Sequence, residues 1–225
     1  MSMEREIRIT PSILNADREH LADEIAKIAG VSDFIHLDVM DDIFVPNFTF
    51  DFDAATAIIR STSIPVDSHL MVADVDQIAI DYAQAGSSSV TFHAEAVKDI
   101  RATAKGIRAA GARAALALKP ATSIDDYSVF LDDLDMFLIM TVEPGFGGQA
   151  FIEEMLSKIK STRKLIGNRP IWLQVDGGIS LETIERAASA GADTFVAGSA
   201  VFKADDPAEM VRSLRQKANA VKESM

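Results

Sequence analysis

The feature that most constrains the fold is a regular alternation of strand-like and helix-like segments along the whole chain. Short apolar runs are each followed by a longer segment whose apolar residues recur at helical spacing. The strand-like runs lie at 7–14, 34–47 (with the turn that ends it), 65–72, 88–93, 114–118, 136–141, 171–175 and 194–197. The helix-like segments lie at 18–28, 54–60, 75–85, 97–110, from 124, 153–166, 181–190 and from 207.

Eight strands that are each followed by a helix predict an all-parallel sheet. At a length of 225 residues, eight such units favour closure into a (β/α)8 TIM barrel over an open doubly wound sheet. No linker, low-complexity segment or shift in composition interrupts the pattern. We therefore expect residues 1–225 to form a single α/β barrel domain.

Composition narrows the class of partner. The chain has no cysteine, which excludes disulfides and a thiolate zinc site and fits a cytoplasmic protein. No signal-like start and no apolar run of about 18 residues is present, so we expect no membrane association. The formal net charge of −12 argues against nucleic acid as a partner. An anionic small molecule would need a strongly local attraction.

One strand has an unusual face. Side chains alternate between the two faces of a strand, so the stretch from Phe34 to Asn47 separates into a polar and an apolar set. The apolar face is suited to packing under helices and carries Ile35, Leu37 and Val39. The other face carries His36, Asp38 and Met40. A carboxylate within such an apolar strand is costly unless it is paired or bound to a metal.

Function in such barrels lies at the carboxyl ends of the strands. Besides the polar face just described, those ends carry Ser12, His69, Met71, His93, Met140 and Asp176. Three of the 4 histidines therefore fall at one end of the predicted barrel.

This set predicts a metal site. Two imidazoles and two carboxylates without sulfur suit Zn²⁺ first, with Fe²⁺, Mn²⁺ and Co²⁺ as alternatives. The predicted ligands are His36, Asp38, His69 and Asp176. The alternative is a buried His/Asp hydrogen-bond network without metal.

Other residues at the strand ends leave two interpretations open. His93 could be a partner of a ligand or a polar core residue. The three methionines could be core filler or an apolar collar around a planar intermediate. These methionines are Met40, Met71 and Met140.

Glycine clusters predict a phosphate site. They occur in the loop EPGFGGQAF at 143–151 and at the ends of the last two strands, as Gly177-Gly178 and Gly198-Ser199. Glycines let backbone N–H groups approach an anion closely, although isolated ones only make turns. The residues expected to contact substrate here are Gly145, Phe146, Gly147, Gly148, Gly177, Gly178, Gly198 and Ser199.

The motifs HLDVMD with FVPN, then HLMV, MTVEPGFGGQ, VDGG and AGSAVF, in that order and spacing, resemble the ribulose-phosphate 3-epimerase family. The match covers residues 11–202. The resemblance implies a barrel of the ribulose-phosphate-binding type and a metal-dependent epimerase that inverts C3 of D-ribulose 5-phosphate to give D-xylulose 5-phosphate. The resemblance therefore implies a role in the pentose phosphate pathway, and we expect a homo-oligomer.

The resemblance assigns roles to individual residues. It makes Asp38 and Asp176 the acid/base pair, with His36 and His69 completing the metal site, and it places Ser12 in contact with substrate. Epimerisation removes a proton from one face of a carbon and returns one to the other face. This requires two bases on opposite sides of the barrel. A metal on the substrate oxygens would stabilise an enediolate.

Two positions depart from the family pattern, and three rival functions remain. Asp42 stands where the family has Gly, and Lys119 stands where it often has Asn. An epimerase of D-allulose 6-phosphate would use the same residues. A phosphate-binding barrel decarboxylase would need a lysine beside the Asp pair, which HLDVMDD lacks. A non-catalytic sugar-phosphate-binding barrel would lose an acid/base Asp, yet both are present.

Overall fold

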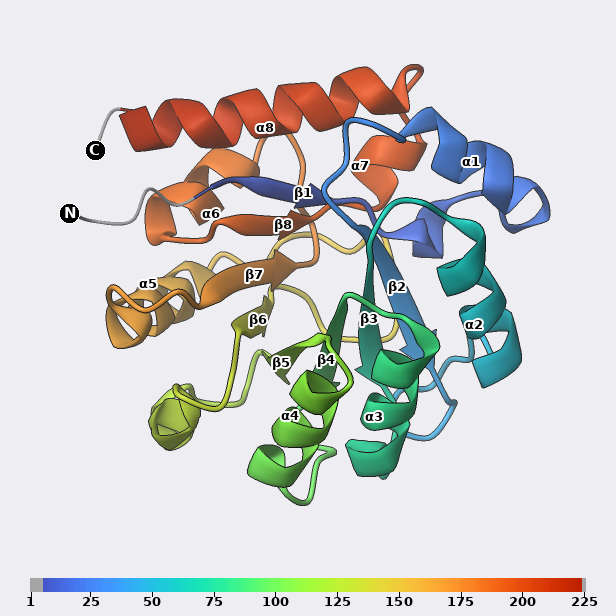
Figure 1. The fold of residues 1–225 in the computed structure, drawn as a ribbon. Coiled ribbons are helices and arrows are strands. Elements are labelled where there is room, and N and C mark those ends of the chain that lie inside the picture. Colours follow the sequence, from blue (N-terminus) through green and yellow to red (C-terminus); the bar gives the residue numbers. More distant parts are fainter. Residues whose placement is uncertain (1–5, 224–225) are drawn as a thin grey trace.

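A computed structural model describes residues 6–223 and shows helices arranged around one eight-stranded sheet (Figure 1). The strands are β1 (Arg8–Thr10), β2 (Ile35–Met40), β3 (Val66–Met71), β4 (Ser89–His93), β5 (Arg113–Leu118), β6 (Met136–Met140), β7 (Trp172–Asp176) and β8 (Thr194–Val196). The helices are α1 (Leu21–Lys27), α2 (Phe52–Ser61), α3 (Val75–Ala85), α4 (Ile100–Ala109), α5 (Met155–Ile166), α6 (Ile184–Ala190), α7 (Ser199–Phe202) and α8 (Pro207–Glu223).

The sheet closes on itself. Its order is β1-β8-β7-β6-β5-β4-β3-β2, and every neighbouring pair is parallel. Between β1 and β2, Ser12 and His36 form an isolated parallel bridge, and His36 N donates to Pro11 O at 2.9 Å. The predicted (β/α)8 barrel is confirmed.

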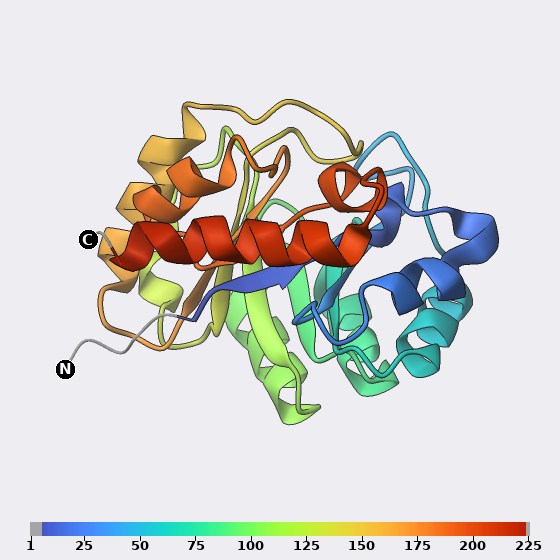
Figure 2. The ribbon, with the colours of Figure 1, turned by 90° about the horizontal axis from the view of Figure 1, so that it is seen from above.

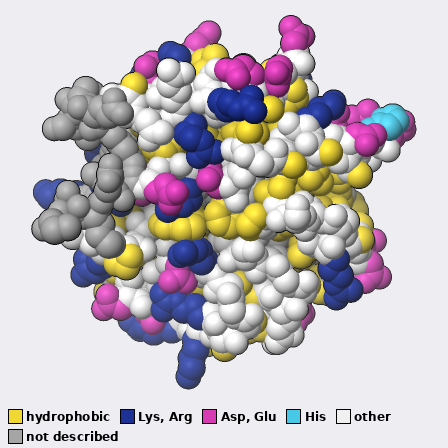
Figure 3. All heavy atoms as spheres, turned by 45° about the horizontal axis from the view of Figure 1, so that its top comes forward, with side chains coloured by type: hydrophobic (Ala, Val, Ile, Leu, Met, Phe, Trp, Pro, Cys, Tyr) yellow, Lys and Arg dark blue, Asp and Glu magenta, His cyan; other side chains and the backbone are white. Residues whose placement is uncertain are grey.

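The main apolar core lies between the sheet and the surrounding helices. Ile35 and Leu37, on the outward face of β2, are completely buried there. The long helix α8 adds Val211, Leu214 and Ala218, whose spacing of three and four residues puts them on one face. The outer surface near α8 shows charged side chains of both signs among apolar ones (Figure 3). Within residues 6–223, no helix is long and apolar enough to cross a membrane.

Two predicted elements were wrong in part. The segment from 124 forms no α-helix; it holds a 3₁₀-helix at Asp125–Phe130. Within this segment, Ile124, Tyr127 and Phe130 recur every three residues, which matches the 3₁₀ period. The strand predicted at 7–14 ends at Thr10, and Ser12 then caps a 3₁₀ turn by accepting from Leu14 N at 3.2 Å.

Side-chain capping accounts for several element ends. Asp206 Oδ1 accepts from Glu209 N at 3.0 Å, so Asp206 caps the start of α8. Asp42 has φ of 59°, a left-handed conformation that favours glycine but that Asp tolerates better than most residues. Its N–H donates to Asn47 O at 2.8 Å and closes the turn after β2. The turn therefore keeps its shape with Asp at this position.

Candidate active site and metal centre

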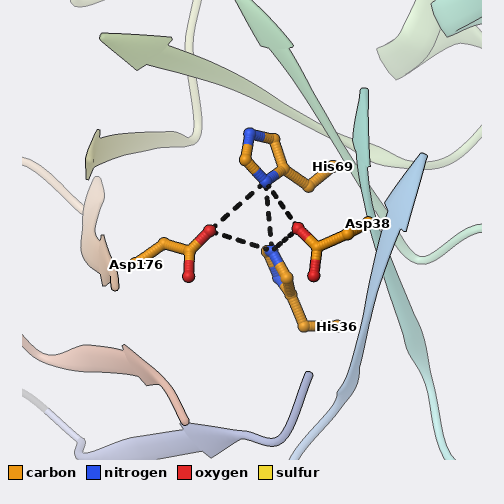
Figure 4. Close-up of side chains that lie close together, drawn as sticks. All are labelled: His36, Asp38, His69 and Asp176. Atoms are coloured by element: carbon orange, nitrogen blue, oxygen red, sulfur yellow. Dashed lines mark hydrogen bonds and ion pairs between the residues drawn. The ribbon is translucent and has the colours of Figure 1, made fainter. Parts of the chain in front are cut away.

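Four polar side chains converge at the carboxyl end of the barrel (Figure 4). His36 and Asp38 come from β2, His69 from β3 and Asp176 from β7. His36 Nε2 and His69 Nδ1 lie 3.3 Å apart. Asp38 Oδ1 is 3.4 Å and 3.1 Å from these two nitrogens, and Asp176 Oδ2 is 3.7 Å and 3.4 Å from them. The parallel register explains the convergence, since Asp38 pairs with His69 across β2 and β3.

The four atoms fit a metal ion. All lie within 4.8 Å of one another. Zinc bonds of about 2.0 to 2.1 Å in a regular tetrahedron give edges of about 3.3 to 3.4 Å. The five measured edges span 3.1 to 3.7 Å around that value. The cluster can therefore hold a divalent cation, as the residue types predicted.

The protonation of these groups follows from their mutual contacts. Burial raises the pKa of Asp38, but the charge of His36 and the hydrogen bonds from both histidines hold it well below its usual range. The pKa of Asp176 is raised by burial and lowered more by its hydrogen bonds with His36 and His69. Burial lowers the pKa of both histidines, and the carboxylates outweigh this and raise it. Both carboxylates thus stay ionised, and positive charge is favoured between them.

Further side chains hold the cluster in place. Ser12 Oγ donates to Asp38 Oδ2 at 2.5 Å, so the hydroxyl expected to contact substrate also orients a proposed base. His36 Nδ1 lies 2.9 Å from Asp67 Oδ2, and Gln174 Nε2 donates to the same oxygen at 2.8 Å. Sequence reasoning missed Asp67, although strand alternation puts it on the face of β3 that also carries His69.

His93 is fully buried and contacts His69, one of the predicted ligands. Its Nε2 lies 2.9 Å from His69 Nε2, and its Nδ1 lies 3.1 Å from Glu95 Oε2. Burial lowers the pKa of His93 to about 4, and Glu95 only partly offsets this. Glu95 was also missed. Its place two residues after His93 was the only signal in the sequence.

A cavity of about 450 Å³ opens above the cluster. It brings together nearly all the predicted substrate residues, whereas His36 and His69 lie beneath it, fully buried. The predicted residues that line it are Ser12, Asp38, Met40, Met71, Met140, Gly145, Phe146, Gly147, Gly148, Asp176, Gly177, Gly178, Gly198 and Ser199.

Two of the glycines that line the cavity lie so close to neighbouring atoms that a side chain would not fit. A Cβ at Gly178 would lie 2.4 Å from Phe151 N, and φ there is +66°. A Cβ at Gly198 would lie 2.4 Å from Asn15 Oδ1. Asn15 and Lys203 also line the cavity and were missed, because neither belongs to a glycine motif. Lys203, just after α7, supplies a cation near the glycines.

The methionines are packed side chains that also line the cavity. Met40 and Met71 form a small buried cluster with Val45, and Met140 packs with Val142 and residues of β5 and β6. All three are at most 2% exposed. Core packing is therefore established for them, and a collar around an intermediate stays a prediction.

Two loops meet over the cavity mouth. The loop after β6 reaches across to the loop after β2 (Figure 2). Asn47 Nδ2 donates to Gly145 O at 3.1 Å. Phe146, at the tip of the longer loop, is 56% exposed and lines the cavity. A segment with this placement can cover a ligand and exclude water.

The fold and the site together define a barrel enzyme with paired carboxylates at a candidate metal centre. The model of the ribulose-phosphate 3-epimerase family matches residues 8–202, and the chain belongs to this family. It is 50% identical over 214 residues to the ribulose-phosphate 3-epimerase of Mycobacterium tuberculosis H37Rv, covering 94% of this chain and 93% of that one. It is 47% identical to ribulose-phosphate 3-epimerase 1 of Cupriavidus necator, covering 90% and 87%. The predicted family is confirmed.

Solved structures with low sequence identity share the fold. A 3-keto-L-gulonate-6-phosphate decarboxylase from Vibrio cholerae matches with a TM-score of 0.73 at 17% identity, covering 96% of this chain and 99% of that one. A 3-hexulose-6-phosphate synthase from Salmonella typhimurium matches with a TM-score of 0.67 at 19% identity, covering 96% and 100%. These matches support the barrel architecture alone.

Proposed function

We propose that this chain interconverts D-ribulose 5-phosphate and D-xylulose 5-phosphate by inverting C3. The observation that carries the proposal is the pair of ionised carboxylates on either side of the two histidines (Figure 4). Asp38 and Asp176 come from strands that are not neighbours in the barrel, and both line the cavity. They can therefore reach opposite faces of one substrate carbon.

In the proposed reaction, one carboxylate removes the C3 proton and the electron pair moves toward the C2 carbonyl, giving an enediolate. The other carboxylate, which takes up one proton from solvent before the reaction begins, donates that proton to the opposite face of C3. The two residues exchange protonation states, and the reverse reaction or exchange with solvent restores them. When bound, a divalent cation supplies Lewis-acid stabilisation of the charge that develops on the substrate oxygens.

We propose His36, Asp38, His69 and Asp176 as the ligands of this cation, and Zn²⁺ as the ion that their spacing suits best. Fe²⁺, Mn²⁺ and Co²⁺ remain alternatives with the same ligand types. Elemental analysis of protein purified without chelator tests this step. Full activity in strong chelator, together with no stoichiometric metal, would contradict it.

The phosphate is proposed to bind at the glycine-lined side of the cavity. Gly148, Gly178 and Gly198 would contribute backbone N–H groups, and α7 begins at Ser199 directly beside them. The ammonium of Lys203 adds a local positive charge in a chain with a net charge of −12. This supplies the local attraction that an anionic substrate needs.

The substrate assay distinguishes the rival functions. We expect turnover of D-ribulose 5-phosphate to exceed that of D-allulose 6-phosphate, and both to stop when the metal is removed. A preference for the hexose phosphate would assign the alternative epimerase. Binding of either sugar phosphate without turnover would assign a non-catalytic barrel. The lysine that lines the cavity is Lys203, on the phosphate side, which argues against a decarboxylase. A single domain, a homo-oligomer and a cytoplasmic location stay predictions.

A further inference from the structure

Two chains of buried hydrogen bonds lead away from the histidines of the cluster. His36 contacts Asp67 through Nδ1, and His69 contacts His93 through Nε2, so the two rings use different nitrogens for these contacts. The nitrogen left facing the carboxylates is Nε2 in His36 and Nδ1 in His69. A metal needs a lone pair on each of these inward nitrogens, so the proton must be on the other nitrogen of each ring.

For His36 the outward partner fixes the proton directly. Asp67 is a buried carboxylate whose Oδ2 lies 2.9 Å from His36 Nδ1 and accepts from Gln174 Nε2 at 2.8 Å. An ionised carboxylate only accepts hydrogen bonds. With a cation bound in the cluster, His36 is neutral, its proton is on Nδ1, and its Nε2 lone pair faces the cation.

For His69 the position of the proton is set indirectly, through His93. Glu95 Oε2 can only accept, so neutral His93 carries its proton on Nδ1 and presents a lone pair at Nε2. His69 Nε2 lies 2.9 Å from that lone pair and must be the donor. When a cation replaces the proton between the carboxylates, His69 Nδ1 is then left with a lone pair for that cation.

We infer that Glu95, acting through His93, is a positioning residue that sets the tautomer of His69 and thereby makes its Nδ1 available to a metal ion. This inference rests on the proposed metal site. It assigns a role to two residues that touch neither the cavity nor the cluster's carboxylates.

The surroundings of Glu95 predict how the side-chain amide of a Glu95→Gln variant would be oriented. Glu95 Oε1 accepts from the backbone N–H of Lys119 at 2.9 Å and from the hydroxyl of Thr122. In Glu95→Gln, the backbone N–H requires an oxygen at that position, so the new NH₂ group faces His93. It then donates to Nδ1, and the proton of His93 moves to Nε2. His69 must accept at Nε2, and its proton moves to Nδ1, where the metal would bind.

Asp67→Asn provides a matched comparison, because its amide can keep the existing hydrogen bonds without changing the tautomer of His36. Asp67 Oδ2 accepts hydrogen bonds from both His36 and Gln174, so the amide oxygen of Asn takes the position of Oδ2. The NH₂ group then faces Thr91 Oγ, which lies 3.4 Å from Asp67 Oδ1 and can accept. Both variants lose one negative charge near a ligand, but only Glu95→Gln is expected to change a tautomer.

The test measures tautomers and zinc affinity. In zinc-loaded parent protein, ¹⁵N NMR of the histidine rings should show protons on Nδ1 of His36, Nε2 of His69 and Nδ1 of His93. Chelator competition should show zinc binding weakened about 100-fold in Glu95→Gln and about 10-fold in Asp67→Asn, within the range for partners of metal ligands. Glu185→Gln, which removes a carboxylate paired with Lys217 on the outer helices, should match the parent.

The outcomes separate this inference from the proposed metal site. A proton on Nε2 of His93 in the parent protein would overturn the inference without any variant, whether or not the variants fold. Equal weakening by Glu95→Gln and Asp67→Asn, with unchanged tautomers, would also overturn it. Absence of zinc binding by the parent would instead refute the metal site on which the inference rests.

Discussion

The two ends of the barrel use charged side chains in opposite ways. At the carboxyl end, carboxylates and imidazoles of different strands are pressed together around a place for a cation. At the amino end, three aspartates are each paired with an arginine. Trp172, at the start of β7, is stacked between the guanidinium groups of Arg8 and Arg113, at 3.8 and 3.9 Å from the ring centroid. One end gathers titratable side chains of several strands in one cluster, and the other pairs its aspartates one by one with arginines.

The amino end also repeats one device three times. An aspartate just before a strand accepts a backbone N–H of the adjacent strand and pairs with an arginine of a helix. Asp33 does so with Ile9 N and Arg215, Asp135 with Ala114 N and Arg108, and Asp193 with Leu173 N and Arg163. Each aspartate therefore joins two strands and a helix at the amino end of the barrel.

The largest expected effect is at the carboxyl end. Asp176→Asn removes one acid/base group, so epimerisation should fall by about 10² to 10⁴-fold. The loaded variant could still exchange the C3 hydrogen of one epimer with D₂O through Asp38. NMR of each epimer in D₂O measures this, with metal content determined alongside because Asp176 is also a proposed ligand. Parent-like epimerisation would exclude the two-base mechanism.

The next effect is on stability at the amino end. Asp193→Ala removes a carboxylate that is only 4% exposed and is paired with Arg163, so the free energy of unfolding should drop by about 3 to 5 kcal/mol. Asp135→Ala removes a more exposed pair and should cost less. Urea unfolding measures both, and turnover per folded molecule should stay unchanged. Loss of turnover in Asp193→Ala without loss of stability would contradict a purely stabilising role for the amino end.

Glycines at the two ends should respond differently. Gly198→Val displaces Asn15 in the cavity and should raise KM about 10- to 100-fold, the value of a hydrogen bond to a charged group. Gly111→Ala, at the end of α4 with φ of +92°, should cost about 1 to 2 kcal/mol of stability without changing KM. Steady-state kinetics and thermal unfolding of both variants provide the measurement. Unchanged sugar-phosphate binding in Gly198→Val would place the phosphate elsewhere.

The smallest effect concerns the stacked tryptophan. Arg113→Gln removes one cation–π contact and should destabilise the protein by about 0.5 to 1 kcal/mol. KM and kcat should equal those of the parent, because Arg113 lies at the opposite end of β5 from the cavity. A change in kinetics without a change in unfolding would show that the two ends are coupled.

The barrel could be predicted from the sequence because its signal is local and repeated. Alternating strand and helix patterns need no knowledge of partners, and the carboxyl-end rule then gathers His36, Asp38, His69 and Asp176. The α-helix expected from 124 was wrong, because apolar spacing in such a short segment fits a 3₁₀-helix as well as an α-helix. The aspartates of the amino end escaped notice because their partners are distant in the chain. Asp193, for example, pairs with Arg163, 30 residues away.

Glu95 and Asp67 show why part of the site could not be predicted. Each lies two residues from a predicted histidine, but a lone carboxylate on a strand or turn carries no sign of which nitrogen it will meet. Their roles depend on the orientation of imidazole rings, which only the folded strands determine. Asn15 is similar, since its importance lies in its closeness to Gly147 and Gly198.

The hydrogen bond from Asn47 to Gly145 links the cover of the cavity to the strand that carries Asp38. Such a bond contributes about 1 kcal/mol net, a factor of about five in the ratio of tethered to released loop. By itself, a bond of this strength does not prevent the loop from opening. Under the proposed function, binding of the phosphate can supply the energy that keeps the loop closed and Asp38 aligned. A ketopentose without a phosphate group would consequently lose turnover rate as well as affinity.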